Sequence, residues 1–374
     1  MNTKKSDDPL RIVLSHVYSW PEVRRGGERY LHEVASALTL AGHQVTILST
    51  GLHRERTNIQ DVPVERLRRR FLPERFFGAQ SDEVAFGLQA LSWVARRPVD
   101  VWHALGTADA ASATLLARPR KFRSVHTSLG LPEKGYWNNR PDRILHEFVA
   151  ARIDSYICLS QASAAGLRAG WSRSAEVVSG GVDIDRFTPS ARRHDRPALL
   201  YSGTLAEERK NLRLLLEAVA ILRAKHPQLE LWLSGPGDPS ALIAASPPAA
   251  KDAVMHLGLG SPDEQGLRYG RAWATVLPSK HEAFGLCLIE SLACGTPIVA
   301  LEDGGGPAEL IQPGIGVASG STSTELAEAC GLAIELAQLH GTAEACRAAS
   351  ERYDWRRSIV PRLEEIYRRH APRS

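Results

Sequence analysis

The fold of this chain is indicated most clearly by one segment, which reads His281-Glu282-Ala283-Phe284-Gly285-Leu286-Cys287-Leu288-Ile289-Glu290-Ser291-Leu292-Ala293-Cys294-Gly295-Thr296-Pro297-Ile298-Val299-Ala300. Its pattern predicts a helix that begins near Phe284 and ends at Gly295, followed by a short strand at 298–300. A glycine at the start of a helix lets backbone N–H groups approach a ligand, and the positive end of the helix then faces that ligand. Two carboxylates, Glu282 and Glu290, flank the apolar run, and the second lies on a side that the core or a cleft could occupy.

Length and composition predict a two-domain protein. The 374 residues, of which 43% are hydrophobic, suffice for two cores. A formal net charge of +4 without an aromatic-interleaved basic motif does not indicate nucleic-acid binding. Five cysteines without C-x-x-C spacing predict reduced, buried thiols, and no acidic cluster has the spacing of a metal site. A polar start without an apolar core, and no run of ~18 apolar residues, predict a cytoplasmic chain that does not span a membrane.

Strand-like apolar runs alternate with helix-period segments along the chain, which predicts an α/β class with parallel sheets. Helices are expected at 28–40 and 211–224. A polar, proline-flanked stretch at 188–197 predicts the linker between domains 1–188 and 197–352, with a final helical segment at 353–374. Strands are expected at 11–15, 44–48, 99–102, 124–126, 155–159, 198–202, 229–234, 253–256 and 274–277.

The segment around Glu282 resembles the donor-sugar signature of the retaining GT-B glycosyltransferases of family four, in which Glu-x-Phe-Gly precedes a second glutamate. Gly180-Gly181-Val182-Asp183 and the following Phe187 resemble another segment of that family. The resemblance covers about residues 10–370. It implies two Rossmann-like domains that face each other across a cleft, with a C-terminal helix that crosses back to the first domain. It also implies that the second domain binds a nucleoside-diphosphate sugar, with no further cofactor and no metal.

The resemblance assigns roles to the residues of the signature itself. Glu290 would accept hydrogen bonds from the ribose hydroxyls, as an ionised carboxylate can. Glu282 would hold the hydroxyls of the sugar and act as a catalytic residue. The backbone around Ala283, Phe284, Gly285 and Leu286 would complete the donor site.

Three glycine-bearing loops are further candidates for the donor site. Gly26 and Gly27, at a strand-to-helix turn, would lie near the diphosphate, although such turns often carry glycine for steric reasons alone. The loop from Gly203 to Asn211 would face the same group, and Gly235 would lie near the base. The family lysine matches Lys210, which would stabilise the charge of the leaving diphosphate.

This chain departs from the family at one position of that loop. An arginine usually follows the glycine, and Thr204 takes its place here. Arg209 could supply the missing charge from another direction. A solvated basic helix start is the alternative interpretation of Arg209 and Lys210.

Two histidines end predicted strands of the first half. The family commonly has a histidine where His126 lies, near the reacting centre, and the acceptor would bind close to it and to the loop 126–136. His103 is a second candidate. The alternative for both is a histidine that is only a polar part of the core.

The stretch Arg66-Leu67-Arg68-Arg69-Arg70-Phe71-Leu72-Pro73-Glu74-Arg75-Phe76-Phe77 mixes arginines with phenylalanines. Such a mixture is a candidate for peripheral contact with an anionic membrane surface. Pro73 limits any continuous amphipathic helix, which favours a surface loop with a few packed aromatics.

The resemblance implies a retaining transfer of a sugar from a nucleoside-diphosphate sugar to a hydroxyl of a small-molecule or lipid-linked acceptor, and no membrane element favours the lipid. Two alternatives stay open. One is a non-catalytic nucleotide-sugar-binding protein, in which Thr204 has removed turnover. The other is a GT-B epimerase that needs no acceptor.

Overall fold

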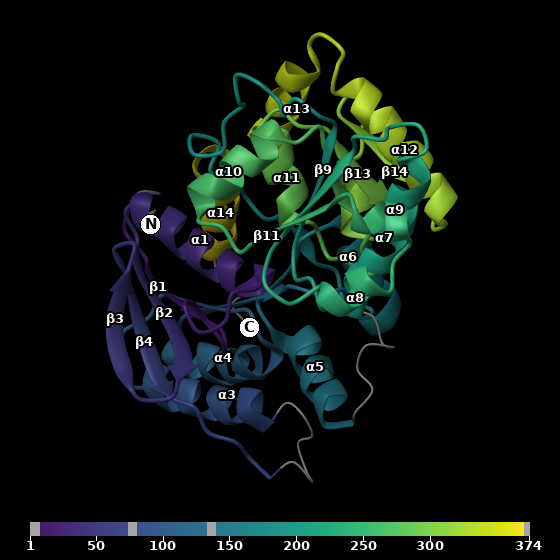
Figure 1. Ribbon diagram of the computed structural model, residues 1–374. Helices are drawn as coiled ribbons and strands as arrows, with labels where there is room; N and C mark the ends of the chain where they lie inside the picture. The colour runs from purple at the N-terminus through teal and green to yellow at the C-terminus, as the bar shows by residue number, and fades with distance from the viewer. Residues whose placement is uncertain (1–7, 74–80, 133–139, 370–374) are drawn as a thin grey trace. The chain divides into compact units, whose positions relative to one another are not determined.

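The computed structural model in Figure 1 describes residues 8–73, 81–132 and 140–369. The chain divides into two compact units. The first contains Met1–Ser179 and Trp355–Ser374, and the second contains Gly180–Asp354. Each unit is a mainly parallel sheet with helices packed against it, so the predicted α/β class with two parallel-sheet domains is confirmed.

The first unit contains an eight-stranded sheet in the order β3-β4-β2-β1-β5-β6-β7-β8. All neighbours are parallel except β3 and β4, which form an antiparallel pair. The strands are β1 (Arg11–Ser15), β2 (Gln44–Gly51), β3 (Glu55–Ile59), β4 (Val62–Arg68), β5 (Val101–Ala104), β6 (Arg123–Ser128), β7 (Ser155–Cys158) and β8 (Glu176–Val177). The main helices are α1 (Gly26–Leu40), α3 (Ser81–Val94), α4 (Thr107–Arg120), α5 (Arg140–Arg152), α6 (Gln161–Trp171) and α14 (Val360–Arg368).

The second unit contains a six-stranded parallel sheet in the order β11-β10-β9-β12-β13-β14. Its strands are β9 (Ala198–Ser202), β10 (Glu230–Ser234), β11 (Val254–Gly258), β12 (Ala274–Leu277), β13 (Ile298–Leu301) and β14 (Gly316–Ser319). Its helices are α7 (Leu212–Leu222), α8 (Ser240–Ala244), α9 (Pro248–Lys251), α10 (Pro262–Arg271), α11 (Leu286–Ala293), α12 (Ser323–Leu336) and α13 (Thr342–Ser350). Leucines of β9, β10, α7 and α12 form one buried core, in which Leu199, Leu231, Leu215 and Leu326 are fully covered.

Residues 355–368 pack within the first unit. The Glu364 carboxylate accepts a hydrogen bond from His43 Nε2 at 2.7 Å, and the Tyr367 hydroxyl lies 2.7 Å from His103 Nδ1. A short π-helix, Trp355–Ile359, leads into α14, and Trp355 packs on Tyr30. These contacts fix the last helix of the chain on the unit where the chain began.

The stretch 188–197, expected to be a free linker, belongs to the second unit, whose first residue is Gly180. The side chain of Arg193 is the reason. It donates hydrogen bonds of 2.7–2.9 Å to Ala272 O, Thr296 Oγ1 and Gly295 O. Arg193 therefore ties this stretch to the ends of α10 and α11, whereas Arg192 and Asp195 are exposed to solvent.

Two features of the core complete the comparison with the expected elements. The strands β3 and β4 were not expected, because their sequence is charged and contains Pro63. The thiols of Cys158, Cys294, Cys330 and Cys346 are free and buried, as predicted, but Cys287 is only half-buried, so the prediction of burial is wrong for that residue.

Candidate functional site

The strand order of the second unit reverses between β9 and β12. From β9 the chain proceeds to β10 and β11 on one side of the sheet, and from β12 it proceeds to β13 and β14 on the other. Open parallel sheets bind ligands where the order reverses in this way. The loops at 203–211 and 278–285 border this point, and they contain most of the residues predicted to hold the donor.

The loops after β9 and β10 touch through two of the predicted glycines. Gly203 N–H donates to Ser234 O at 2.9 Å. Gly235 has a φ of 143°, and a Cβ added there would lie 2.0 Å from Gly203 O. Gly235 is thus required by this close approach of two backbones, whatever its distance from a nucleotide base.

Lys210, Arg209 and Glu282 meet in one ion-pair cluster. Lys210 Nζ lies 2.5 Å and Arg209 Nη1 2.8 Å from the same oxygen, Glu282 Oε2. Arg209 also contacts Glu207 at 2.7 Å. The side chains of Lys210 and Glu282 are only 14% and 16% exposed. The structure therefore joins two predicted catalytic residues and the predicted substitute cation, although 72 positions separate Lys210 from Glu282.

The two cations set the charge state of the acid. Burial alone would raise the pKa of Glu282, but the charges of Lys210 and Arg209, together with their hydrogen bonds, bring the pKa below its ordinary value. Glu282 is accordingly an ionised carboxylate at neutral pH. It holds both cations beside the carboxyl ends of β9 and β12, where they can meet an anion.

Thr204, which takes the place of the family arginine, has its backbone tied into the same loop. Its carbonyl accepts a hydrogen bond of 3.0 Å from the hydroxyl of the buried Tyr201. A threonine cannot supply the absent charge. Arg209 does bring a guanidinium to the cluster through its contact with Glu282, and this contact could not be read from the sequence.

The backbone of Glu282 is held between two loops. Its N–H donates to Gly304 O at 3.0 Å, and its carbonyl accepts from Gly306 N–H at 2.9 Å. A Cβ at Gly306 would lie 2.1 Å from Ala283 O, so the turn 304–306 must be glycine-rich to come this close. The preceding residue, His281, has a φ of 52°, which is unusual for a residue with a side chain and often marks a functional loop.

The helix α11 begins at Leu286, two residues later than the expected start near Phe284. Gly285, with a φ of 94°, is its N-cap residue, and the helix covers Leu286–Ala293. The side chains of Ala283 and Phe284 are buried, and Phe284 packs on Tyr353. These residues can therefore serve a ligand through backbone groups at the positive end of α11. Leu286 packs near Gly180, where a Cβ would lie 2.3 Å from its Cδ2.

Glu290 lies inside the second unit. Its side chain is 0% exposed, and its Oε2 accepts a hydrogen bond of 2.8 Å from the Tyr269 hydroxyl. This places the second glutamate of the signature between α10 and α11. Contact with a ribose requires a change of its rotamer or of the residues that cover it.

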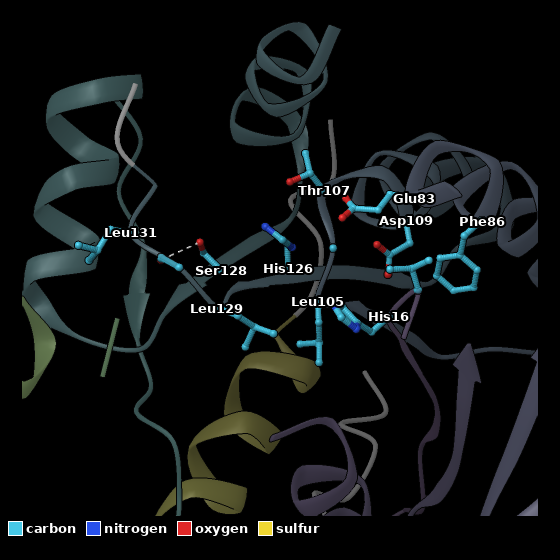
Figure 2. Close-up of a pocket in the computed structure, with 13 residues that line it drawn as sticks. His16, Glu83, Phe86, Leu105, Thr107, Asp109, His126, Ser128, Leu129 and Leu131 are labelled. Carbon is cyan, nitrogen blue, oxygen red and sulfur yellow. Dashed lines mark hydrogen bonds between the residues drawn. The ribbon is translucent and has the colours of Figure 1, made fainter. Parts of the chain in front are cut away.

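The first unit has its own strand-order reversal, between β1 and β5, and a cavity of about 160 Å³ opens there. Figure 2 shows the residues that line it, which come from the end of β6, from the loops after β1, β5 and β6, and from α3 and α4. They are His16, Val17, Glu83, Phe86, Leu105, Gly106, Thr107, Asp109, His126, Ser128, Leu129, Gly130 and Leu131. Of these, the sequence had indicated only His126 and the loop that follows it. The part of that loop at 133–136 lies outside the described residues.

His126 presents one ring nitrogen to this cavity. Its Nδ1 lies 3.0 Å from Ala104 O, and because a carbonyl only accepts, Nδ1 carries the proton. Burial lowers the pKa of His126 to about 4, so the ring is neutral at pH 7. The Nε2 atom is then a hydrogen-bond acceptor, and no described residue donates to it. This arrangement can receive a hydroxyl of a ligand.

Glu83, Asp109 and Thr107 are cavity residues that sequence reasoning missed. Burial, with Asp82 and Asp142 nearby, raises the pKa of Glu83 to about 7. Burial also raises the pKa of Asp109 to about 8, although Ser15 is hydrogen-bonded to it. No motif marks any of the three in the sequence, and they lie on helices that were not expected, α3 for Glu83 and α4 for Thr107 and Asp109.

The remaining candidates of the first unit are His103, which lies in the core, and the glycine pair at the start of α1. Both ring nitrogens of His103 are used within the first unit, by Tyr367 and by Thr127 at 2.7 Å each, so the alternative of a polar core residue holds for it. Gly26 and Gly27 begin α1, and a Cβ at Gly26 would meet nothing within 4 Å. Packing within the described residues does not demand glycine at 26. At 27, a Cβ would lie 3.0 Å from Leu129 Cδ1.

The basic stretch is partly built into the sheet. Arg66 in β4 is buried and donates hydrogen bonds to Trp20 O at 2.6 Å and to Glu55 at 3.1 Å. Arg69 stacks over Tyr18 at 5.0 Å. Glu74–Phe77 lie outside the described residues. Within the described part of the chain, no helix is long and apolar enough to cross a membrane.

Comparison with protein families decides what these two units are. Residues 24–186 match the model of Glycosyltransferase Family 4, and residues 183–351 match the model of Glycosyl transferases group 1. The chain belongs to the group 1 glycosyltransferases of GT-B fold. Their two models meet close to the boundary between the two units.

Several glycosyltransferases of known name are similar to this one. The D-inositol 3-phosphate glycosyltransferase of Corynebacterium urealyticum is 27% identical over 82% of this chain and 78% of that protein. A phosphatidyl-myo-inositol mannosyltransferase of Propionibacterium freudenreichii is 27% identical over 78% of this chain and 77% of its own. The D-inositol 3-phosphate glycosyltransferase of Arthrobacter is 34% identical, but the match spans only 34% of that protein.

Solved structures share the fold of this glycosyltransferase. Sucrose-phosphate synthase from Thermosynechococcus elongatus matches with a TM-score of 0.78 and 22% identity, over 96% of this chain and 98% of that one. Anabaena HepE in complex with UDP-glucose matches with a TM-score of 0.73 and 18% identity, over 95% of this chain and 100% of that one.

Proposed function

We propose that this glycosyltransferase moves a sugar from a nucleoside-diphosphate sugar to a hydroxyl of a small-molecule acceptor, with retention of anomeric configuration. The observation that carries the proposal is the cluster of Lys210, Arg209 and Glu282 at the strand-order reversal of the second unit. A related fold binds UDP-glucose, which supports a donor of this class.

The cluster is suited to a leaving diphosphate. When the bond between sugar and phosphate breaks, negative charge develops on the phosphate oxygen that leaves. Lys210 and Arg209 would stabilise that charge more in the transition state than in the ground state, and this difference is what accelerates a reaction. The N-terminal end of α11, behind Gly285, would add its positive end to the same charge.

Glu282 would do two things in this scheme. One oxygen holds the cations in place, and the other can accept a hydrogen bond from a hydroxyl of the donor sugar. Gly203, Thr204 and Gly235 would border the nucleotide through their backbones. Glu290 would bind the ribose after it exchanges its Tyr269 contact for ribose hydroxyls.

The first unit would bind the acceptor. Nε2 of His126 would accept a hydrogen bond from a hydroxyl of the acceptor or of the transferred sugar. The leaving phosphate would take the proton of the attacking hydroxyl, so that no protein nucleophile is needed. A cavity of about 160 Å³ is small beside the ~300 Å³ or more of drug-sized sites, which favours a small acceptor over a lipid-linked one.

The proposal is tested first by donor binding. A panel of nucleoside-diphosphate sugars is added to the protein, and the melting temperature is measured, since a ligand of the folded form raises it with concentration. The best donor is then incubated with hydroxyl acceptors, and NMR reports the anomeric configuration of the product. An epimerised donor formed without acceptor, or binding without any transfer or donor hydrolysis, would refute the proposal in favour of an epimerase or a binding protein.

A matched pair of variants tests the role of the cluster. Lys210→Ala should lower turnover by about a hundredfold, the range seen when one charge-stabilising group is removed. Lys225→Ala removes an exposed lysine of the same unit and should leave turnover unchanged. Full activity of the Lys210 variant would exclude this lysine from the site.

A further inference from the structure

The cavity of the first unit has an acidic lining. Two carboxyl side chains line it, Glu83 and Asp109, and among the described residues no lysine or arginine does. Figure 2 shows the two acids close to each other, one from α3 and one from α4. Burial is the main cause of the raised pKa of Asp109, and the charge of Glu83 raises it further.

Glu83 is available for a ligand. No described residue makes a hydrogen bond or an ion pair with its carboxylate. The charged groups that act on it are Asp82, Asp142 and Arg25, besides its effect on Asp109. The Tyr18 hydroxyl donates to Asp82 at 2.7 Å, and the Arg25 guanidinium lies 2.8 Å from Glu28. The acids near Glu83 thus outnumber the cations, and the one nearby cation already contacts another acid.

Two further polar groups point into the same space. Thr107 is only 9% exposed, yet its hydroxyl bonds to no described residue, and Figure 2 shows it beside Glu83. His126 is 3% exposed, with its Nε2 as an acceptor that no described residue uses. Buried polar groups without protein partners are costly unless a ligand or water satisfies them. Their position in a cavity therefore indicates a polar ligand.

We propose that the acceptor bound in this cavity carries a protonated amine beside its hydroxyls, as an amino sugar or an aminocyclitol does, and carries no phosphate there. The inference rests on the proposed function. Glu83 would form an ion pair with the ammonium, while Thr107 and His126 would hydrogen-bond the hydroxyls.

A phosphate at this place would face the wrong charges. The Glu83 carboxylate would lie against it, which costs affinity when like charges are brought together, whereas Asp109, with its pKa raised to about 8, is mainly protonated at pH 7 and adds little repulsion. The start of α4 could otherwise attract an anion, but Asp109 already accepts backbone hydrogen bonds in that first turn. The names of two relatives contain inositol phosphate or phosphatidylinositol, so a phosphate-bearing acceptor is the natural competitor.

The test compares ring-shaped polyols that carry an amine, only hydroxyls, or a phosphate. Glucosamine, glucose and glucose 6-phosphate, together with D-inositol 3-phosphate, are offered at pH 7 with the donor that gives the largest thermal shift. Binding is read by saturation-transfer NMR and transfer by release of the nucleoside diphosphate. The amine should exceed the phosphates in kcat/KM, or in affinity if transfer is not seen, by about tenfold or more. If no amine-bearing ring binds, or a phosphate binds as well as the amine, the inference is wrong.

Variants locate the effect on one carboxylate. Glu83→Gln keeps the shape but removes the charge, and it should lower kcat/KM for glucosamine by about tenfold while that for glucose changes by less than about twofold. Glu147→Gln, an exposed acid that pairs with Arg143 on α5, is the control and should change neither. An unchanged amine-to-hydroxyl ratio in Glu83→Gln would overturn the assignment. The thermal-shift measurement with the donor panel is a separate experiment. If no donor binds there, the proposed function itself is refuted.

Discussion

The ion pair between Lys210 and Glu282 permits a double-mutant test of the donor cluster. The variants are Lys210→Met, Glu282→Gln and the double substitution. Both side chains are largely buried and their charged atoms lie 2.5 Å apart, so their coupling energy should fall at about 1–3 kcal/mol. Glu282→Gln should destabilise more than Lys210→Met, because it leaves the largely buried Lys210 without its acid and beside Arg209, which keeps only Glu207, whereas Arg209 still pairs with Glu282 when the lysine is lost.

The assay is urea unfolding at pH 7, followed by circular dichroism. The two units have separate cores, so the variants should shift the transition of the second unit and leave that of the first. The lowered pKa of Glu282 determines how its contribution to stability changes with pH. Its contribution is present above the unfolded pKa of ~4.3 and is lost as the pH falls through the folded pKa, so the difference between wild type and Glu282→Gln should shrink in acid. A coupling energy below about 0.3 kcal/mol would refute the reasoning.

Two other predictions concern stability. Gly306→Ala should destabilise the second unit by about 1–3 kcal/mol and weaken donor binding, since its Cβ would lie 2.1 Å from Ala283 O; Gly26→Ala, with open space around it, is the control in urea unfolding. His103 is buried with its pKa lowered to about 3, mainly by burial, so the unfolded chain binds its proton first and stability should fall as the pH drops from ~6.5 toward 3. His103→Asn should flatten part of that slope, and an unchanged slope would exclude His103 as its source.

The strands at the centre of each sheet could be predicted, because their apolar runs need only local sequence to be recognised. The strands β1, β9 and β12 fall where their sequences place them. The pair β3 and β4 could not be predicted in the same way. Arg66 is buried there only because Trp20, Glu55 and Thr57 accept its hydrogen bonds, and such partners are fixed by the tertiary fold.

The residues of the candidate site also fall into two groups, those with a local sequence signature and those brought together only by the tertiary fold. The glycines and the two glutamates are visible in a short segment, because close backbone approach and a helix start have local signatures. The ion pair of Lys210 with Glu282 joins two loops far apart in the chain, and Glu83 reaches the cavity from a helix with no motif of its own. Burial of Glu290 was open in the sequence, since its side of the helix could face either the core or a ligand.

The central claim is that the diphosphate of an activated sugar binds at the carboxyl ends of β9 and β12. A crystal structure of the protein with UDP, or with the nucleoside diphosphate that gives the largest thermal shift, tests this most directly. The account predicts phosphate oxygens within ~3 Å of Lys210 Nζ and against the backbone at Gly285. A diphosphate that occupies another part of the molecule, while Lys210 still contacts only Glu282, would contradict it.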